Sequence, residues 1–424
     1  MSIVSQIERI QNNISAAYSA CESQGATMPQ LRNSNNLAQT IGSISAGGGV
    51  EPEKKAVNFY DFDGTRLYSY TFAEALQLSA LPGLPSHDGL TAQEWNCTLA
   101  KIQTSAQISY PIDVGATYVT SDGATRFYFF VAKGTKLPDF QIHMYIPGNT
   151  SVTVDWGDGT TETVANTGTG FAAMYAEKTG SSEVNADTVV CVRIIGGSFK
   201  LGSNENYINM YGNNTTNNTA NNGPVLTKVE FGSNCTEILD RTFCPFQRLS
   251  AVVLPNNITI IGQYAFSECS MLKAAVLPKN ITLSGSVFNY ANALERVVAG
   301  NSRGIHFCAL RGCYGLTEYV VPFNSGVVDR IFESAFSYCC NLLTVKLPSS
   351  INEIFGEAFK NCSKLYSVDL TAYTDPSRIP SLRHTNAFSY TSAYLKFKVA
   401  NQTMLNAFST ATNWSAYASN FVIA

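Results

Sequence analysis

The chain has few charges and few histidines for its length. Its 424 residues include 28 Lys and Arg, 31 Asp and Glu and 4 His, so that 14% are charged, against about 25% in typical soluble domains. The net charge is −3, whereas proteins that bind chiefly nucleic acid or anionic lipid present a basic surface. We therefore expect no nucleic-acid partner.

Long hydrophobic runs are also absent. No segment approaches the ~18–20 consecutive apolar residues that cross a bilayer, so we expect no membrane insertion. The amino-terminal residues lack a basic segment followed by a continuous apolar one, and we expect no cleaved secretion signal. The 45% of hydrophobic residues suffices for burial and excludes disorder, and the length predicts two to four structural units.

The sequence shows neither a catalytic constellation nor a metal site. Its 11 Cys include no CxxC pair, and no HExxH, GxSxG or Walker pattern occurs near His87, His143, His306 or His384. We therefore expect no catalytic residues, no cofactor and no bound metal. The cysteines are expected to be buried reduced thiols, which is their usual state as small apolar residues.

A heptad pattern occupies the start of the chain. Ile3, Ile7, Ile10 and Ile14 are separated by steps of four and three, and Ile at both seam positions favours trimers or tetramers over dimers. We interpret residues 1–50 as a helical oligomerisation or docking segment, ending in a glycine linker, that would assemble a homotrimer. The alternative is an amphipathic helix packed on its own domain.

Residues 51–135 are predicted to form a small α+β domain. The DFDGT stretch at residues 61–65 places an Asp-Gly step between two aromatic strands, which predicts a β-hairpin because the turn needs a positive φ. The same stretch resembles the nucleophile motif of haloacid-dehalogenase-type phosphatases, but no downstream carboxylate pair for Mg²⁺ follows. The hairpin is therefore preferred. Thr91 with Glu94 forms a predicted capping box that begins a helix over residues 91–101.

Residues 136–203 are predicted to form a small β-sandwich. Alternating apolar residues run into an Asp-Gly turn in the stretch VTVDWGDGT at residues 152–160, which predicts a second hairpin. The WGDGT signature resembles the PKD-like β-sandwich modules of bacterial surface and phage proteins. Asp155 and Asp158 fall short of the six to eight oxygens that Ca²⁺ needs, so turn stabilisation is preferred. Residues 204–223 are an Asn-rich linker or loop.

Residues 224–395 repeat with a period near 23. The aligned positions hold an aromatic or aliphatic residue: Phe243, Phe266, Phe288, Leu310, Phe336, Phe359 and Phe388. Three residues later Cys is common, as at Cys269, Cys313, Cys339 and Cys362, and six residues later Leu recurs. Such fixed offsets predict stacked coils that share continuous internal columns.

This pattern, with copies such as INEIFGEAFKNCSKL at residues 351–365, resembles the BspA-like leucine-rich repeats. The resemblance implies a solenoid over residues 224–395, closed by a carboxyl-terminal cap over residues 396–424. The whole chain is thus predicted to be mixed and mainly β, and multidomain: a helical segment, a small α+β domain, a PKD-like sandwich and a leucine-rich-repeat solenoid.

The outward-facing residues of the repeat strands are the candidate binding site. Successive valines would form an apolar stripe flanked by charges, which is typical of a partner-binding patch. The candidate residues are Val253, Val276, Arg296, Val298, Glu318, Val320 and Lys346. Two alternatives stay open: the β-branched residues merely stabilise the sheet, or another domain covers them.

The leading hypothesis is a non-enzymatic receptor-binding protein of a phage tail, located on the virion and attached by its amino end. Its solenoid would recognise a bacterial surface protein or polysaccharide. Residues 7–29 and 57–71 resemble the leaders of tail-associated proteins in phages of gut Firmicutes. The alternative is a leucine-rich-repeat adhesin at the cell surface of a gut bacterium, or extracellular, that binds host or bacterial proteins.

Overall fold

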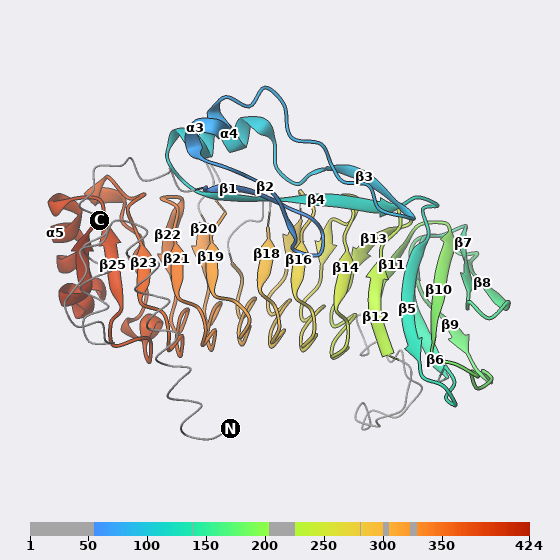
Figure 1. Ribbon diagram of the computed structural model, residues 1–424. Coiled ribbons are helices and arrows are strands. Elements are labelled where there is room, and N and C mark those ends of the chain that lie inside the picture. The colour runs from blue at the N-terminus through green and yellow to red at the C-terminus, as the bar shows by residue number, and fades with distance from the viewer. Residues whose placement is uncertain (1–54, 138, 203–224, 280, 300–304, 323–328) are drawn as a thin grey trace, which may run out of the picture. The chain divides into compact units, whose positions relative to one another are not determined.

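In the computed structural model (Figure 1), residues 55–424 are mainly β-strands, with few and short helices between them. The described residues are 55–137, 139–202, 225–279, 281–299, 305–322 and 329–424. The predicted heptad seam and the trimer contacts, which involve Ile3, Ile7, Ile10 and Ile14, lie outside these ranges, as does the Asn-rich linker at residues 204–223.

The first part of this unit, residues 55–120, is a four-stranded sheet with two helices, here called the covering domain. The sheet order is β2-β1-β4-β3, with β1 parallel to β4 and antiparallel to β2. Its core includes Phe59, whose ring lies edge-on to Trp95 with centroids 4.8 Å apart. The elements are β1 (Val57–Tyr60), β2 (Arg66–Tyr70), α3 (Phe72–Leu76), β3 (Leu90–Trp95), α4 (Leu99–Gln107) and β4 (Ile112–Thr120).

The hairpin predicted at residues 61–65 is confirmed. Gly64 has a φ of +87°, and the Asp63 carboxylate accepts a hydrogen bond from the Thr65 amide at 2.8 Å. The Asp61 carboxylate is buried and lies 2.8 Å from Nε2 of His87. The Asp61 carboxylate also accepts from the Phe62 amide at 2.8 Å, so both aspartates stabilise the turn, and the segment that follows is the strand β2 rather than a helix.

The helix predicted over residues 91–101 is wrong. Residues 91–95 belong to β3, which pairs antiparallel with β4 and buries Trp95. The helix α4 begins only at Leu99. Its N-cap is Thr98, whose side chain accepts a hydrogen bond from the Lys101 amide. Pairing with β4 and burial of Trp95 outweigh the local capping preference of Thr91 and Glu94.

The predicted sandwich strands continue directly into the repeats. One six-stranded sheet has the order β14-β12-β5-β10-β7-β8, and the other has the order β17-β15-β13-β11-β6-β9. The two sheets of the sandwich are therefore also the first strands of the two faces of the solenoid. Strand β5 (Thr125–Val131), which was predicted to belong to the α+β domain, joins the first of these sheets. The strands within the predicted sandwich are β6 (Phe140–Ile146), β7 (Thr150–Asp155), β8 (Thr161–Asn166), β9 (Ala172–Lys178), β10 (Thr188–Gly196) and β11 (Phe199–Leu201).

The WGDGT segment is a hairpin, as predicted: β7 pairs antiparallel with β8. The Asp155 carboxylate accepts from the Gly157 amide and pairs with Arg193 at 2.5 Å. The Asp158 carboxylate accepts from the Thr160 amide and pairs with Lys178 at 2.6 Å. These are the contacts of turn stabilisation.

The repeats stack as parallel coils with two strand ladders. The first ladder, here called the strand face, consists of β12 (Val225–Glu230), β14 (Ala251–Val253), β16 (Ala274–Val276), β18 (Arg296–Val298), β19 (Glu318–Val320), β21 (Thr344–Lys346), β23 (Ser367–Asp369), β25 (Lys396–Val399) and β26 (Phe421–Ile423). The opposite ladder consists of β13 (Cys235–Ile238), β15 (Ile260–Ile261), β17 (Thr282–Leu283), β20 (Asp329–Ile331), β22 (Ile351–Ile354) and β24 (Ser381–Leu382).

The predicted internal columns are confirmed. Consecutive rings stack at centroid distances of 5.0 Å for Phe336–Phe359 and 5.0 Å for Phe359–Phe388, with interplanar angles of 5° and 3°. Phe243, Phe266 and Phe288 form a second stack. Leu310, which is also buried, separates the two stacks.

The repeat cysteines form a column of their own. Each thiol donates to the carbonyl of the aligned residue one coil earlier, as Cys339 does to Leu310 at 3.0 Å and Cys362 to Phe336 at 3.1 Å. Ten cysteines among the described residues carry free thiols. Burial raises the pKa of the Cys339 thiol to about 12, because the thiolate would lose its hydration.

The carboxyl end covers the last coil. Helix α5 (Gln402–Thr410) begins after Asn401, whose side chain accepts from the Met404 amide. The ring of Trp414 packs against Phe388, Phe397 and Phe408. The remaining short helices are η2 (Pro376–Arg378), η3 (Thr385–Phe388) and η4 (Trp414–Asn420). This cap shields the apolar end that a stack of coils would otherwise expose.

Candidate functional site: the strand face

The strand face has the register that the repeats predict. Val252, Val297 and Val345 point inward and belong to the solenoid core, while their neighbours on either side point outward. Parallel pairing aligns the outward residues across coils, as between Val276 and Val298 and between Val320 and Lys346. The candidate residues therefore do lie on one face.

The covering domain occupies the first half of that face. Strand β4 lies against β14, β16 and β18 (Figure 1). Val253 is part of the core of the covering domain, and Val276 and Val298 form a buried cluster with Tyr60. Of the alternatives that the sequence left open, the structure shows the one in which another domain covers the valines.

Two glycines permit this close approach. A Cβ built on Gly115 would lie 2.3 Å from Cγ1 of Val276, and one on Gly64 would lie 2.7 Å from the Cβ of Ala274. Such distances are shorter than any ordinary carbon–carbon contact. The backbone of the covering domain therefore touches the side chains of the strand face directly.

Polar contacts fix the covering domain further along the solenoid. The guanidinium of Arg296 pairs with Asp113 at 3.1 Å and lies 4.3 Å from the centroid of the Tyr60 ring. Burial, and then the charge of Asp113, raise the pKa of Tyr60 to about 12. Burial also raises the pKa of Asp113, although Arg296 acts in the opposite direction.

Backbone carbonyls of the solenoid also receive hydrogen bonds. The hydroxyl of Tyr110 lies 2.8 Å from the carbonyl oxygen of Val321 and 3.0 Å from that of Lys346. The amide of Asn96 donates to the carbonyls of Leu277 and Val298 at 2.9 and 3.1 Å. The carbonyls of Val298 and Lys346 also accept from the amides of Leu277 and Val321. The covering domain therefore adds a second hydrogen bond to these two carbonyls and supplies a partner to the carbonyls of Leu277 and Val321.

The remaining candidate residues lie near the edge of the covered area. Glu318 is exposed and its carboxylate is 3.9 Å from the Arg296 guanidinium. Val320 is half-buried. Lys346 pairs with Asp369 at 3.2 Å, and its ammonium lies 5.6 Å from the centroid of the Tyr110 ring. The ligand-binding role of the candidate residues stays a prediction; in the structure several of them contact the chain's own covering domain.

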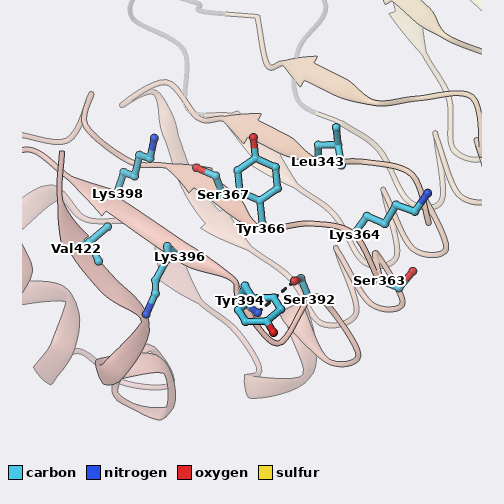
Figure 2. A pocket seen from close by; sticks show the side chains of 10 residues that line it. All are labelled: Leu343, Ser363, Lys364, Tyr366, Ser367, Ser392, Tyr394, Lys396, Lys398 and Val422. Atoms are coloured by element: carbon cyan, nitrogen blue, oxygen red, sulfur yellow. Dashed lines mark hydrogen bonds between the residues drawn. The ribbon is translucent and has the colours of Figure 1, made fainter. Parts of the chain in front are cut away.

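An open groove of about 620 Å³ lies beyond the covering domain, over the last coils. Figure 2 shows its side chains, which come from β23, β25, β26 and the turns before the strands. The lining residues are Leu343, Ser363, Lys364, Tyr366, Ser367, Ser392, Tyr394, Lys396, Lys398 and Val422.

The groove combines cations with exposed rings. Tyr366 and Tyr394 are 48% and 82% exposed, although aromatic rings usually gain most by burial. Lys396 and Lys398 alternate with the buried Phe397 and Val399 on β25 and so point outward together. The candidate residues predicted from the sequence end at Lys346 on β21, the strand before β23. The alternation of lysines with apolar residues in KFKV at residues 396–399 was a usable signal for this groove.

The four histidines do not meet in the structure. His87, His143, His306 and His384 lie on four separate segments, beside Asp61, Tyr175, Phe332 and Asn386 respectively. No cluster of three or more His, Cys, Asp or Glu that could hold a metal occurs in this part of the chain. Nor does any described helix have the length and hydrophobicity to span a bilayer.

Comparisons with known proteins identify the repeats. The BspA type Leucine rich repeat region matches residues 204–317 and 288–412, in six copies. A leucine-rich repeat protein from Bacteroides ovatus ATCC 8483 is 18% identical, over 41% of this chain and 55% of its own, with a TM-score of 0.27. This chain thus spans about half the length of that protein.

A leucine rich cell surface protein from Faecalibacterium prausnitzii A2-165 is 16% identical, over 44% of this chain and 83% of its own, with a TM-score of 0.16. No curated protein matches. The period near 23, the stacked Phe and Cys columns and the family match agree. Residues 204–412 of this chain therefore match the BspA type Leucine rich repeat region.

Proposed function

We propose that the protein is a non-enzymatic binding protein that attaches to a cell surface component through the groove over its last coils. The observation that carries this proposal is the contrast along one face. The covering domain buries Val253, Val276 and Val298, whereas Tyr366 and Tyr394 are left exposed beside lysines. Exposed aromatic groups in a concave surface are typical of binding sites.

The architecture supports a binding role more than a catalytic one. A solenoid holds outward side chains in fixed rows, which suits recognition of an extended partner. Catalysis would need a nucleophile, a base and an orienting group that converge. Among the groove residues there is no His, Cys, Asp or Glu, so its chemistry is that of hydrogen-bond donors and rings.

The location that we propose is the surface of a bacterial cell, where the protein would act as a leucine-rich-repeat adhesin. The virion tail is the second proposal, and its support is confined to the amino-terminal leader, most of which lies outside the described residues. The genes that flank the coding sequence separate the two. Sortase or secretion genes favour the adhesin, while tail, baseplate or lysis genes favour the phage protein.

Two further proposals concern parts of the chain with no test so far. One is trimeric attachment through Ile3, Ile7, Ile10 and Ile14, which light scattering would detect as a mass of three chains. The other is that residues 136–203 are related to PKD-like β-sandwich modules. Neither is needed for binding through the groove.

The experiment for the main proposal measures binding of fluorescently labelled protein to intact bacteria and to cultured epithelial cells by flow cytometry. We expect the wild-type protein to bind at least one surface, and Tyr366→Ala/Tyr394→Ala to bind at least about tenfold more weakly, since exposed aromatic residues dominate many interfaces. Tyr175→Ala, which removes a 51% exposed ring outside the groove, is the matched control. Equal binding by the groove variant and the control would contradict the proposal.

A further inference from the structure

We propose that the groove over the last coils binds an acidic polysaccharide, one whose sugar rings carry carboxylates. This inference rests on the proposed function and names the chemical class of its ligand. Three observations carry it: the unpaired cations, the exposed rings and the kind of hydrogen-bonding groups that line the groove.

The cations of the groove have no carboxylate partner among the described residues. Lys364 donates to the side-chain carbonyl of Asn341 at 2.8 Å, and Lys396 and Lys398 are exposed on β25. The lining contains three Lys and no Asp or Glu. In a chain with a net charge of −3, this is a local positive field that attracts an anion.

Other cations of the strand face are neutralised within the chain. Lys228 pairs with Glu230 at 2.5 Å, Arg296 with Asp113 at 3.1 Å and Lys346 with Asp369 at 3.2 Å. The carboxylate of Asp369, which is next to the groove, also accepts from the amide and the hydroxyl of Thr371. Asp369 is also the register partner of Lys398 on β25, but its ion pair is with Lys346. The three lysines of the groove therefore carry more positive charge than this one neighbouring carboxylate offsets.

The exposed rings favour a ligand with flat apolar patches. Figure 2 shows Tyr366 and Tyr394 on the same groove, with Ser392 accepting a hydrogen bond from the Tyr394 amide at 3.1 Å. A pyranose presents C–H groups on its faces and hydroxyls around its rim. Its faces can cover a tyrosine ring while the rim reaches the phenol hydroxyl and the ammonium groups.

The donor and acceptor inventory favours a sugar chain over an acidic peptide. A bound peptide brings one backbone N–H per residue that needs an acceptor. The groove offers Lys ammonium groups, which only donate, and hydroxyls, one of which, on Ser363, already donates to the carbonyl of Cys340 at 3.5 Å. Each sugar hydroxyl both donates and accepts, so it can accept from the Lys ammonium groups and donate to the hydroxyl oxygens of the groove, and the carboxylates of the polymer match the lysines.

The test measures binding of the full chain to three uronate polymers, polygalacturonate, alginate and hyaluronate, by biolayer interferometry. Fully methyl-esterified polygalacturonate keeps the sugar without the charge, and poly-L-glutamate keeps the charge without the sugar. We expect at least one uronate polymer to bind, the ester to bind at least about tenfold more weakly, and affinity to fall as salt is raised, since exposed charges are screened.

Lys396→Gln/Lys398→Gln is expected to weaken uronate binding by about a hundredfold, about tenfold for each charge-assisted contact. Lys133→Gln/Lys136→Gln makes the same change of charge on two exposed lysines at the other end of the molecule and is expected to bind normally. Equal losses in the two variants would overturn the proposal, because net charge alone would then explain binding.

The remaining outcomes separate this inference from the proposed function. Binding of poly-L-glutamate as tight as that of the uronates would overturn the inference in favour of an acidic protein partner. If none of the three uronates binds while Tyr366→Ala/Tyr394→Ala still abolishes cell binding, the proposed ligand class is wrong, but the groove remains the site that binds cells. Unchanged cell binding by that variant removes the proposed function itself.

Discussion

Gly115→Ala offers the most direct test of the contact between the covering domain and the strand face. The new methyl group would lie 2.3 Å from Cγ1 and 3.0 Å from Cγ2 of Val276. Over-packing of this kind in a buried interface costs about 1–3 kcal/mol of unfolding free energy. Val276→Ala alone removes two buried methyl groups, which costs about 2 kcal/mol.

Combining the two changes should relieve the clash. Without its Cγ atoms, residue 276 presents only its Cβ, 3.2 Å from the added methyl group, a distance that a small shift can correct. Gly115→Ala/Val276→Ala should therefore cost about 2 kcal/mol instead of a sum near 4 kcal/mol, and the interaction energy between the sites should be about 2 kcal/mol.

The assay is urea denaturation followed by circular dichroism, with the four proteins of the cycle measured side by side. Gly83→Ala is the matched control, because a Cβ at Gly83 meets no atom within 4 Å, and it should change stability by less than about 0.5 kcal/mol. Strictly additive effects, or a Gly115→Ala protein as stable as the Gly83→Ala control, would refute the packing of β4 on this face.

Three further predictions concern other contacts. Tyr110→Phe removes the hydroxyl beside the carbonyls of Val321 and Lys346 and should lower the unfolding free energy by about 1–3 kcal/mol; no change in the urea midpoint would contradict it. Burial raises the pKa of the Cys339 thiol to about 12, so this thiol should resist iodoacetamide at pH 8 in the folded protein and react in urea. Its pKa in the folded protein lies above the unfolded value near 9. Its contribution to stability is therefore complete below pH 9 and is lost as the pH rises toward 12. Burial acts to raise the pKa of Asp158, but hydrogen bonds from Lys178 and Thr160 outweigh it and lower the pKa to about 2, so the small stabilisation that Asp158→Asn removes should be present above pH 4 and vanish as the pH falls to 2; melting curves of both proteins that differ equally at pH 7 and pH 2 would contradict this.

The repeats were predictable because their information is local and periodic. Phe359 lies 23 residues after Phe336, and the two rings stack because each coil repeats the backbone path of the last. Both hairpins were also predictable from an Asp-Gly step between alternating residues. The helix expected over residues 91–101 failed because a strand pairing with β4 outweighed a local capping signal.

The covered half of the strand face could not be predicted from periodicity. Asn96 and Val298 are 202 positions apart, and Tyr110 and Lys346 are 236 positions apart, so no local pattern relates them. The sequence pattern of outward valines is the same whether these residues bind another protein or contact a domain of the same chain. The groove was missed for another reason, because Lys396 and Lys398 follow an interval of 29 residues, from Phe359 to Phe388, that departs from the period near 23.

The covering domain also has a mechanical consequence. In a stack of coils held only by nearest-neighbour contacts, tension can unfold one repeat at a time. Here the covering domain connects distant coils. Its Glu94 accepts a hydrogen bond from Asn256 at 3.0 Å, and its Tyr110 donates to the carbonyl of Lys346. Under a stretching load, the coils between these two points should unfold together rather than one at a time, so the molecule would be stiff over this length.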